Sequence, residues 1–347
     1  MTFKISFTLL SLLPCLYAYK IDASCSGNDA SLMKTAAEQA FDMASQAYDA
    51  LTVTGMRDSN VDRLVELLFC REGQTAAELD TSALINSFLG IRQMRNENAD
   101  PGNNPDEVVI YCNMDRLEER DDGWYDTESG VALADPPDHQ LQECRDKKDR
   151  TLMYTWVPEN DQEQPIGPGQ VTICPWFLQY SRQLKYKTFK DISSKYLKAL
   201  FQIPLSTTKL GPFEPIDTVN LLDKVLLHEF THTVAGGRTD DVNWPDNEMF
   251  GKAYGWTSCK ELAKSGQVGA EFNADTLALF GSGVRLLKQE PPSYITDDGR
   301  ITKNNPAAKR AVPSYFEYPT STAPSRAFET FITVIKERRA MATAFSS

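Results

Sequence analysis

Histidine is scarce in this sequence, which has three histidines in 347 residues. After the N-terminal segment, no run of residues is apolar and long enough for a transmembrane helix, so we expect no membrane partner. Acidic residues outnumber basic residues by 48 to 36, and the net charge of −12 argues against nucleic acid as a partner. Asn-x-Ser/Thr sequons are absent, so N-glycosylation is not expected.

The cysteines include no Cys-x-x-Cys pair, which argues against a second metal site. Cys15 lies in the apolar N-terminal segment. The other cysteines form an even, widely spaced set: Cys25, Cys70, Cys112, Cys144, Cys174 and Cys259. Such a set is typical of disulfides in an exported protein, although the spacing does not choose among the pairings.

The N-terminus has the features of a secretory signal peptide. Lys4 is basic, residues 5–13 are apolar, and small residues follow at Ala18 and Ala23. We expect the signal to cover residues 1–18, with its end as late as residue 24, and the mature protein to be secreted. The folded domain is then expected over residues 25–290, followed by a tail rich in Pro and Ser with a short helix over residues 291–347.

The hydrophobic pattern predicts an α+β domain that is mainly helical and has a small antiparallel sheet. Apolar residues at three- and four-residue steps predict helices over residues 29–51, 61–69, 82–94, 195–201, 217–235, 258–264, 270–287 and 327–342. Short β-branched and aromatic runs predict strands over residues 108–112, 152–157 and 170–174. The segments between these strands are charged and rich in Asp, Gly and Pro, so we expect loops there.

The pentapeptide His228-Glu229-Phe230-Thr231-His232 lies within an apolar helical run. Residues four apart lie on one face of a helix, so His228 and His232 can direct their imidazoles at one metal ion. Glu229 then lies beside the ion, where a general base is needed. This HExxH arrangement serves zinc-assisted hydrolysis of peptide bonds.

A chance match on an amphipathic helix is the alternative interpretation of this motif. Against it, two of the only three histidines in the chain fall here, and the flanking residues are uncharged. Gly236 and Gly237 follow the motif and predict a left-handed C-terminal cap. We therefore expect the motif to bind one zinc ion per chain.

A third protein ligand is needed, because zinc sites of this kind use three side chains and leave one position for water. His139 is the only other histidine, and its polar Pro-Pro-Asp-His-Gln segment suggests a surface position. The third ligand is therefore expected to be a carboxylate downstream of the helix.

Four landmarks, in this order, resemble the aspzincins, the deuterolysin-like secreted metalloendopeptidases of fungi. They are the HExxH motif, Gly237-Arg238-Thr239-Asp240-Asp241, Ala253-Tyr254-Gly255 and Asn273-Ala274-Asp275. The resemblance covers most of residues 25–285. Many peptidase clans share HExxH alone, but the ordered set is much more specific.

The resemblance implies a zincin-like fold and assigns a role to each matching residue. Zinc would be bound by His228, His232 and Asp241. Glu229 would act as the general base, and Tyr254 would hydrogen-bond the oxyanion of the reaction.

The sequence departs from the compact aspzincin pattern, in which the ligand Asp stands three residues before the Tyr. Gly251 occupies that position here, and an insertion over residues 242–253 separates Asp241 from Tyr254. Asp240 is the neighbouring carboxylate that could bind zinc in place of Asp241.

A gluzincin-like ligand set is a further alternative. Glu271 and Asp275 form an ExxxD pattern, in which the Glu binds zinc and the Asp braces a histidine. The order of the landmarks favours Asp241 as the ligand. Asp275 would then support the site from behind the ligands or face the substrate pocket.

The sequence thus predicts a secreted, monomeric zinc metalloendopeptidase that acts on proteins or peptides. The alternative is a secreted zinc-binding protein on the same fold with little or no catalysis, such as a zinc scavenger, a surface antigen or an effector. The intact Glu229 favours catalysis, whereas the irregular spacing of Asp241 and Tyr254 leaves room for the alternative.

Overall fold

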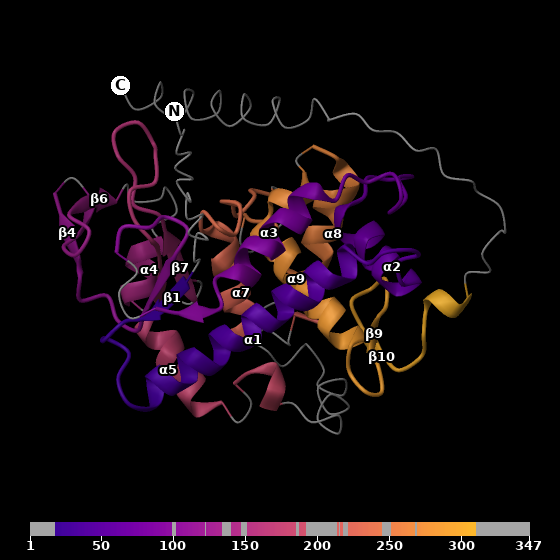
Figure 1. The fold of residues 1–347 in the computed structure, drawn as a ribbon, viewed down its shortest axis with the longest axis horizontal. Helices are drawn as coiled ribbons and strands as arrows, with labels where there is room; N and C mark the ends of the chain where they lie inside the picture. Colours follow the sequence, from indigo (N-terminus) through magenta and orange to yellow (C-terminus); the bar gives the residue numbers. More distant parts are fainter. Residues whose placement is uncertain are drawn as a thin grey trace, which may run out of the picture. The chain divides into compact units, whose positions relative to one another are not determined.

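The chain folds into a mixed α/β structure with small sheets (Figure 1). The computed structural model describes residues 18–98, 102–121, 123–133, 140–146, 151–184, 187–191, 214, 216–217, 221–244, 251–267 and 269–309. These residues belong to the first of two compact units, Met1–Lys309 and Arg310–Ser347. His139 and the helices expected over residues 195–201 and 327–342 lie outside the described residues.

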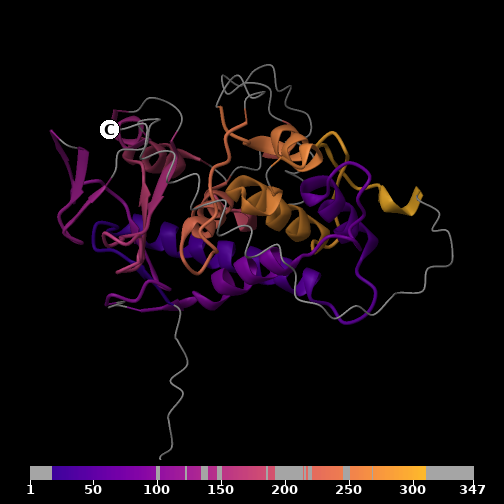
Figure 2. The same ribbon diagram turned by 90° about the horizontal axis from the view of Figure 1, so that it is seen from above.

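The largest sheet has five strands in the order β2-β1-β3-β8-β7. Its members are β1 (Ala18–Ile21), β2 (Asn96–Glu97), β3 (Val108–Tyr111), β7 (Met153–Trp156) and β8 (Gly169–Ile173). The neighbours from β2 to β8 pair in parallel, and only β7 is antiparallel, to β8. Figures 1 and 2 show the strands gathered at one end of this unit, with α1 running from them into the helical part.

The prediction of a small antiparallel sheet is wrong for this sheet, although all three predicted strands exist. Every residue of β3 and β8 is buried, as expected for parallel strands covered on both faces. The continuous apolar run of β3 was the available signal for parallel pairing. The order of the strands depends on connections through distant helices, which strand composition does not encode.

A second, antiparallel sheet occupies the segment after β3 that was expected to be loops. It consists of β4 (Leu117–Arg120), β5 (Gly123–Asp126) and β6 (Val131–Leu133). One side of this sheet is buried through Leu117, Trp124 and Leu133. The charged residues of β4 are exposed. Because most residues of β4 are charged, its sequence lacks the β-branched and aromatic pattern by which strands were predicted.

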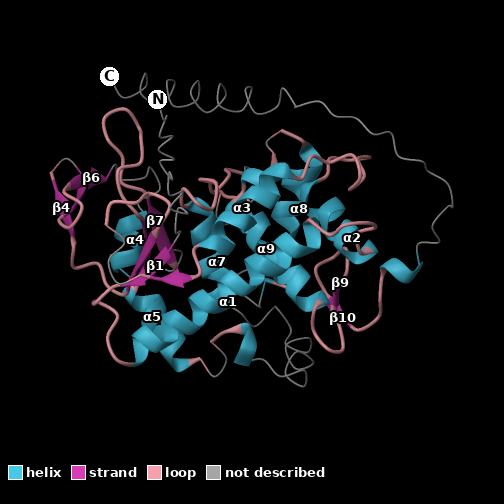
Figure 3. Ribbon diagram, viewed as in Figure 1, coloured by secondary structure: helices cyan, strands magenta, loops and turns pink. Residues whose placement is uncertain are grey.

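The helices predicted for the first hundred residues are confirmed as α1 (Asn28–Leu51), α2 (Ser59–Phe69) and α3 (Ser82–Gln93). Helices α4 (Gln140–Asp146) and α5 (Pro175–Gln183) were not predicted. The helix expected over residues 270–287 is interrupted at Asn273, where the backbone is extended. It consists of the 3-10 turn η4 (Ala270–Phe272) and α9 (Ala274–Leu287). Figure 3 separates the helices from the strands by colour.

Three helices, α1, α9 and α7 (Leu222–His232), pack side by side in the core (Figure 1). The packing face of α1 consists largely of alanines without exposed surface, which allows close approach: Ala36, Ala37, Ala40, Ala44 and Ala47. The Phe41 ring of α1 stacks on the Phe230 ring of α7 with 5.1 Å between centroids. Because Phe230 belongs to the HExxH motif, this contact fixes the motif in the core.

Four of the six described cysteines form two disulfides, Cys25–Cys112 and Cys144–Cys174. The expectation that all six would be paired is wrong, because Cys70 and Cys259 are free and buried. An even number of cysteines could not reveal that two of them stand in the helical core, Cys70 at the end of α2 and Cys259 within α8 (Gly255–Ser265).

Strand β1 lies between β2 and β3, with Ala18 and Tyr19 buried. A signal ending at residue 18 would leave most of β1, whereas an end at residue 24 would remove it. At the other end, the folded unit continues to Lys309, past the expected boundary at residue 290. Strands β9 (Tyr294–Ile295) and β10 (Ile301–Thr302) belong to it, and Arg63 of α2 donates a hydrogen bond to the Ile295 carbonyl.

Among the described residues, no helix is both long enough and apolar enough to cross a membrane.

Candidate metal centre

Helix α7 carries the HExxH motif and ends at His232, the last residue of the motif. It is shorter than the predicted range 217–235. Thr233 is extended, and its hydroxyl donates to the Phe230 carbonyl at 2.7 Å and accepts from the Gly236 amide at 3.1 Å. The expected glycine cap is wrong: Gly237 has a φ of 96°, but it lies in the turn beyond the helix.

The turn after α7 reverses the chain and returns it past the two histidines. The Thr239 amide donates to the Thr231 carbonyl at 3.0 Å, which holds the returning segment against the helix. A Cβ on Gly236 would lie 1.9 Å from the Phe230 carbonyl oxygen, and one on Gly90 of α3 would lie 1.8 Å from the Ala235 carbonyl oxygen. Only glycine fits these close approaches.

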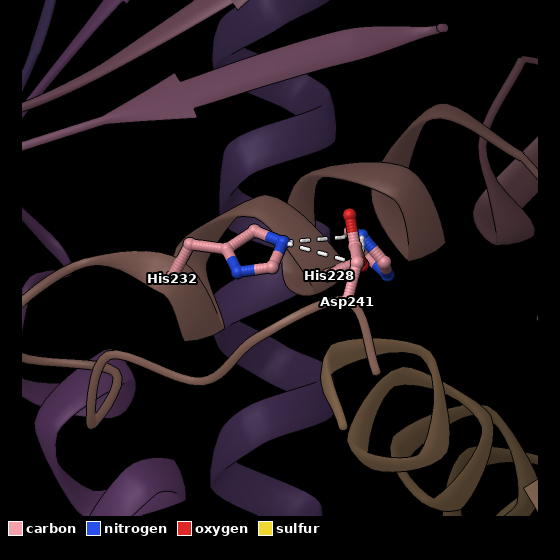
Figure 4. Close-up of side chains that lie close together, drawn as sticks. All are labelled: His228, His232 and Asp241. Atoms are coloured by element: carbon pink, nitrogen blue, oxygen red, sulfur yellow. Dashed lines mark hydrogen bonds and ion pairs between the residues drawn. The ribbon is translucent and has the colours of Figure 1, made fainter. Parts of the chain in front are cut away.

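His228, His232 and Asp241 converge on one point (Figure 4). Nε2 of His228 lies 3.3 Å from Nε2 of His232. Oδ1 of Asp241 lies 3.2 Å from Nε2 of His228 and 3.6 Å from Nε2 of His232. The structure therefore brings together the two histidines of the motif and the carboxylate that the resemblance assigns.

These three atoms fit a metal ion. A tetrahedral zinc ion with bonds of about 2.0–2.1 Å would separate its ligand atoms by about 3.3–3.4 Å, close to the observed distances. Oδ1 of Asp241 is buried and accepts no hydrogen bond from the described residues, although it faces both imidazoles. Two imidazole nitrogens and one carboxylate oxygen suit zinc and related transition metals, whereas calcium and magnesium prefer oxygen ligands alone.

Both imidazoles are oriented from behind by acceptors. Nδ1 of His232 lies 2.7 Å from the Thr239 carbonyl oxygen, so Nδ1 carries the proton and Nε2 the lone pair. Nδ1 of His228 lies 3.6 Å from Oδ1 of Asp275. Acceptors in this position fix the tautomer and the ring orientation of a metal-binding histidine.

The charges of the cluster stabilise each other. Burial opposes the charged form of His228, but the negative charge of Asp241 raises its pKa to about 10. Burial would likewise raise the pKa of Asp241, yet the two histidines hold this pKa below its ordinary value. A metal ion at this point would compete with protons for the same ligand atoms.

Glu229 is buried between α7 and the large sheet. Its Oε2 accepts a hydrogen bond of 2.6 Å from the Thr155 hydroxyl of β7. The strand thus fixes the carboxylate next to the two imidazoles. Nothing in the sequence singled out Thr155, because the contact joins residues 74 positions apart.

The two ends of the apparent insertion between Asp241 and Tyr254 pair with each other as the arms of a hairpin. The Ala253 amide donates to the Val242 carbonyl at 2.8 Å, and Asn243 forms an antiparallel bridge with Lys252. The two arms of this hairpin bring its ends, Asp241 and Tyr254, side by side. The irregular spacing is therefore compatible with a shared site.

Asn273 joins the hairpin to α9. Its side-chain oxygen accepts from the Val242 amide at 3.1 Å, and its side-chain nitrogen donates to the Ala253 carbonyl at 2.9 Å. The Asn273-Ala274-Asp275 landmark thus has two structural roles. Asn273 holds both arms of the hairpin, and Asp275 stands behind His228.

Tyr254 lies beside the cluster, at the start of α8. Its ring centroid is 5.9 Å from that of His228. Burial and the nearby charge of Asp241 raise the pKa of the Tyr254 hydroxyl well above its ordinary value. The hydroxyl is therefore a hydrogen-bond donor at any physiological pH.

The alternative ligands do not join the cluster. Asp240 is exposed and forms a backbone bridge with Asn273. Glu271 lies in η4, where burial raises its pKa and the influential charges are Arg71 and Asp80. Asp275 is buried, paired with Lys224 and close to Nδ1 of His228.

No family model matches this chain, and no curated protein matches it at a significant level.

Proposed function

We propose that this protein is a secreted zinc metalloendopeptidase of the aspzincin type. The observation that carries the proposal is the combination of three converging ligand atoms with a glutamate held beside them by a strand. The resemblance of the four sequence landmarks supports the same assignment. The two disulfides support secretion, because disulfides persist in oxidising compartments.

The arrangement of the large sheet supports a zincin-like fold. Strand β7 is the antiparallel edge of an otherwise parallel sheet, and Thr155 places this edge against the HExxH helix. An edge strand can bind an extended peptide by main-chain hydrogen bonds. We assign β7, of the three predicted strands, to this role.

Each residue of the site has a role in the proposed hydrolysis. A zinc ion, when bound, would make water a nucleophile near neutral pH and polarise the scissile carbonyl. Glu229 takes the proton of the attacking water and passes it to the leaving amine. The Tyr254 hydroxyl donates a hydrogen bond to the oxygen that gains negative charge. Thr155 keeps Glu229 in the orientation that these proton transfers need.

Zinc content and casein hydrolysis, measured on wild type and three variants, test the proposal. Wild type should carry one zinc ion per chain and cleave casein. Glu229→Gln should keep zinc and lose turnover, by about 100-fold or more. Asp241→Ala should lose both, whereas Asp240→Ala, its exposed neighbour, should keep both.

The outcomes separate the alternatives. Zinc binding without cleavage would favour the zinc-binding protein without catalysis. Loss of zinc in Asp240→Ala, with retention in Asp241→Ala, would contradict the ligand assignment. A wild type that binds no zinc would overturn the proposal.

A further inference from the structure

A buried lysine lies one helical turn before the first histidine of the motif. Lys224 and His228 stand four residues apart on α7, so their side chains lie on the same face. Lys224 is 8% exposed, and lysine is rarely buried unless it is paired. Its ammonium forms an ion pair with Oδ1 of Asp275.

Asp275 connects this lysine to the metal centre. Its Oδ1 faces the Lys224 ammonium and also Nδ1 of His228, 3.6 Å away. Its Oδ2 accepts the Gly255 amide at 2.8 Å, at the first residue of α8. Gly255 follows Tyr254, so one carboxylate links the orientation of His228 to the position of Tyr254.

The charge balance of this network requires Lys224. A histidine that binds a metal through Nε2 is a neutral imidazole. Lys224 is then the cation paired with the buried Asp275 carboxylate. Removing one partner of a buried pair leaves an uncompensated charge, which is strongly unfavourable. Asp275 would move toward other donors or toward solvent, and His228 would lose its acceptor.

We infer that Lys224 is a positioning residue of the metal centre: it holds Asp275 against His228 and so directs Nε2 of His228 at the ion. The inference rests on the proposed function only in that the cluster binds a metal. It does not require catalysis.

The test is the affinity of the full-length protein for Zn²⁺, measured by competition with a chromophoric chelator. Lys224→Met removes the charge and keeps a long unbranched side chain. Its affinity should be about 10- to 100-fold weaker than that of wild type, the usual effect of losing a residue behind a metal ligand. Lys224→Arg should recover most of the affinity. With Co²⁺ in place of Zn²⁺, the d–d absorption should shift in Lys224→Met and not in Lys224→Arg.

Arg285→Met is the matched control. Arg285 of α9 is also a buried cation paired with an α7 carboxylate, Asp223, at 3.2 Å. Asp223 precedes Lys224 in the chain, but the pair does not touch the metal ligands. This variant should bind Zn²⁺ as wild type does. If it weakens binding as much as Lys224→Met, general packing of α7 is responsible and the inference is wrong.

A double-mutant cycle with Asp275→Asn tests the route of the effect. If Lys224 acts through Asp275, adding Lys224→Met to Asp275→Asn should cause little further loss. Independent, additive losses would overturn the inference. Should Lys224→Met not fold, as judged by circular dichroism, Lys224→Gln removes the charge while keeping a donor and serves in its place. A wild type without Zn²⁺ affinity contradicts the proposed function, whereas equal affinities of wild type and the charge-removing variant contradict this inference alone.

Discussion

Individual groups behind the two histidines and Glu229 determine how the centre is arranged. Thr155 contacts Glu229 and Asp275 contacts His228 through their side chains, and Thr239 contacts His232 through its main-chain carbonyl. Each contact fixes the direction of a reactive atom. Because the three contacts come from three separate segments, the site depends on the packing of these segments around α7.

Replacing Thr155 by Val should lower kcat by about 10- to 100-fold without loss of zinc, because Glu229 loses the donor that orients it. The substitution preserves the shape of the side chain and removes only the hydroxyl. Thr155→Ser keeps the donor and should retain most of the activity. Steady-state kinetics and zinc analysis on both variants check this. Equal activity in the Val variant would show that Glu229 is oriented by other contacts.

The turn after α7 and the hairpin that follows it bring the sequence landmarks together in one site. The turn after α7 returns the chain so that Asp241 faces the histidines, and the following hairpin places Tyr254 beside Asp241. Both elements depend on backbone hydrogen bonds close to the ligands. A change in either element should therefore disturb metal binding without altering a ligand.

Gly236→Ala should destabilise the protein by about 2 kcal/mol or more, because the new Cβ would overlap the Phe230 carbonyl and force the turn to move. The melting temperature should fall by about 4 °C or more, and zinc should be retained less tightly. Gly167→Ala is the control, since the nearest atom to its Cβ would be 3.5 Å away. Thermal unfolding of both variants, with and without a chelator, provides the measurement. Equal melting temperatures would mean that the turn adapts at little cost.

At the scale of the whole described unit, the disulfides lie in the part of the molecule that contains the sheet, and the free thiols lie among the helices. Cys25–Cys112 joins the segment after β1 to the end of β3, and Cys144–Cys174 joins α4 to the end of β8. The helical part shares one continuous core of buried apolar side chains with the sheet. Its stability therefore rests on packing.

A mature chain that begins at residue 19 should titrate two free thiols when unfolded without a reductant, from Cys70 and Cys259. In the native state both should react slowly with alkylating reagents at pH 8. Burial raises the pKa of Cys70 to about 11 and that of Cys259 well above its ordinary value, so little thiolate is present. Ellman titration before and after unfolding checks this. An unfolded protein without free thiols would mean that these two cysteines form a third disulfide.

Features that depend only on neighbouring residues were predictable from the order of the amino acids. The three- and four-residue periodicity identified α1, α2 and α3, and the spacing of His228 and His232 placed both on one face of α7. Four-residue spacing on a helix is a local property, so it could be predicted without the fold.

The choice among candidates that are equivalent in sequence depends on contacts between distant segments. Asp240 and Asp241 are adjacent carboxylates, and the hydrogen bonds of the returning chain determine which one faces the histidines. The pairing of the cysteines, the parallel order of β3 and β8, and the support of Glu229 by Thr155 depend in the same way on contacts between distant segments. Such contacts form only when the whole core packs, so no local pattern of residues encodes them.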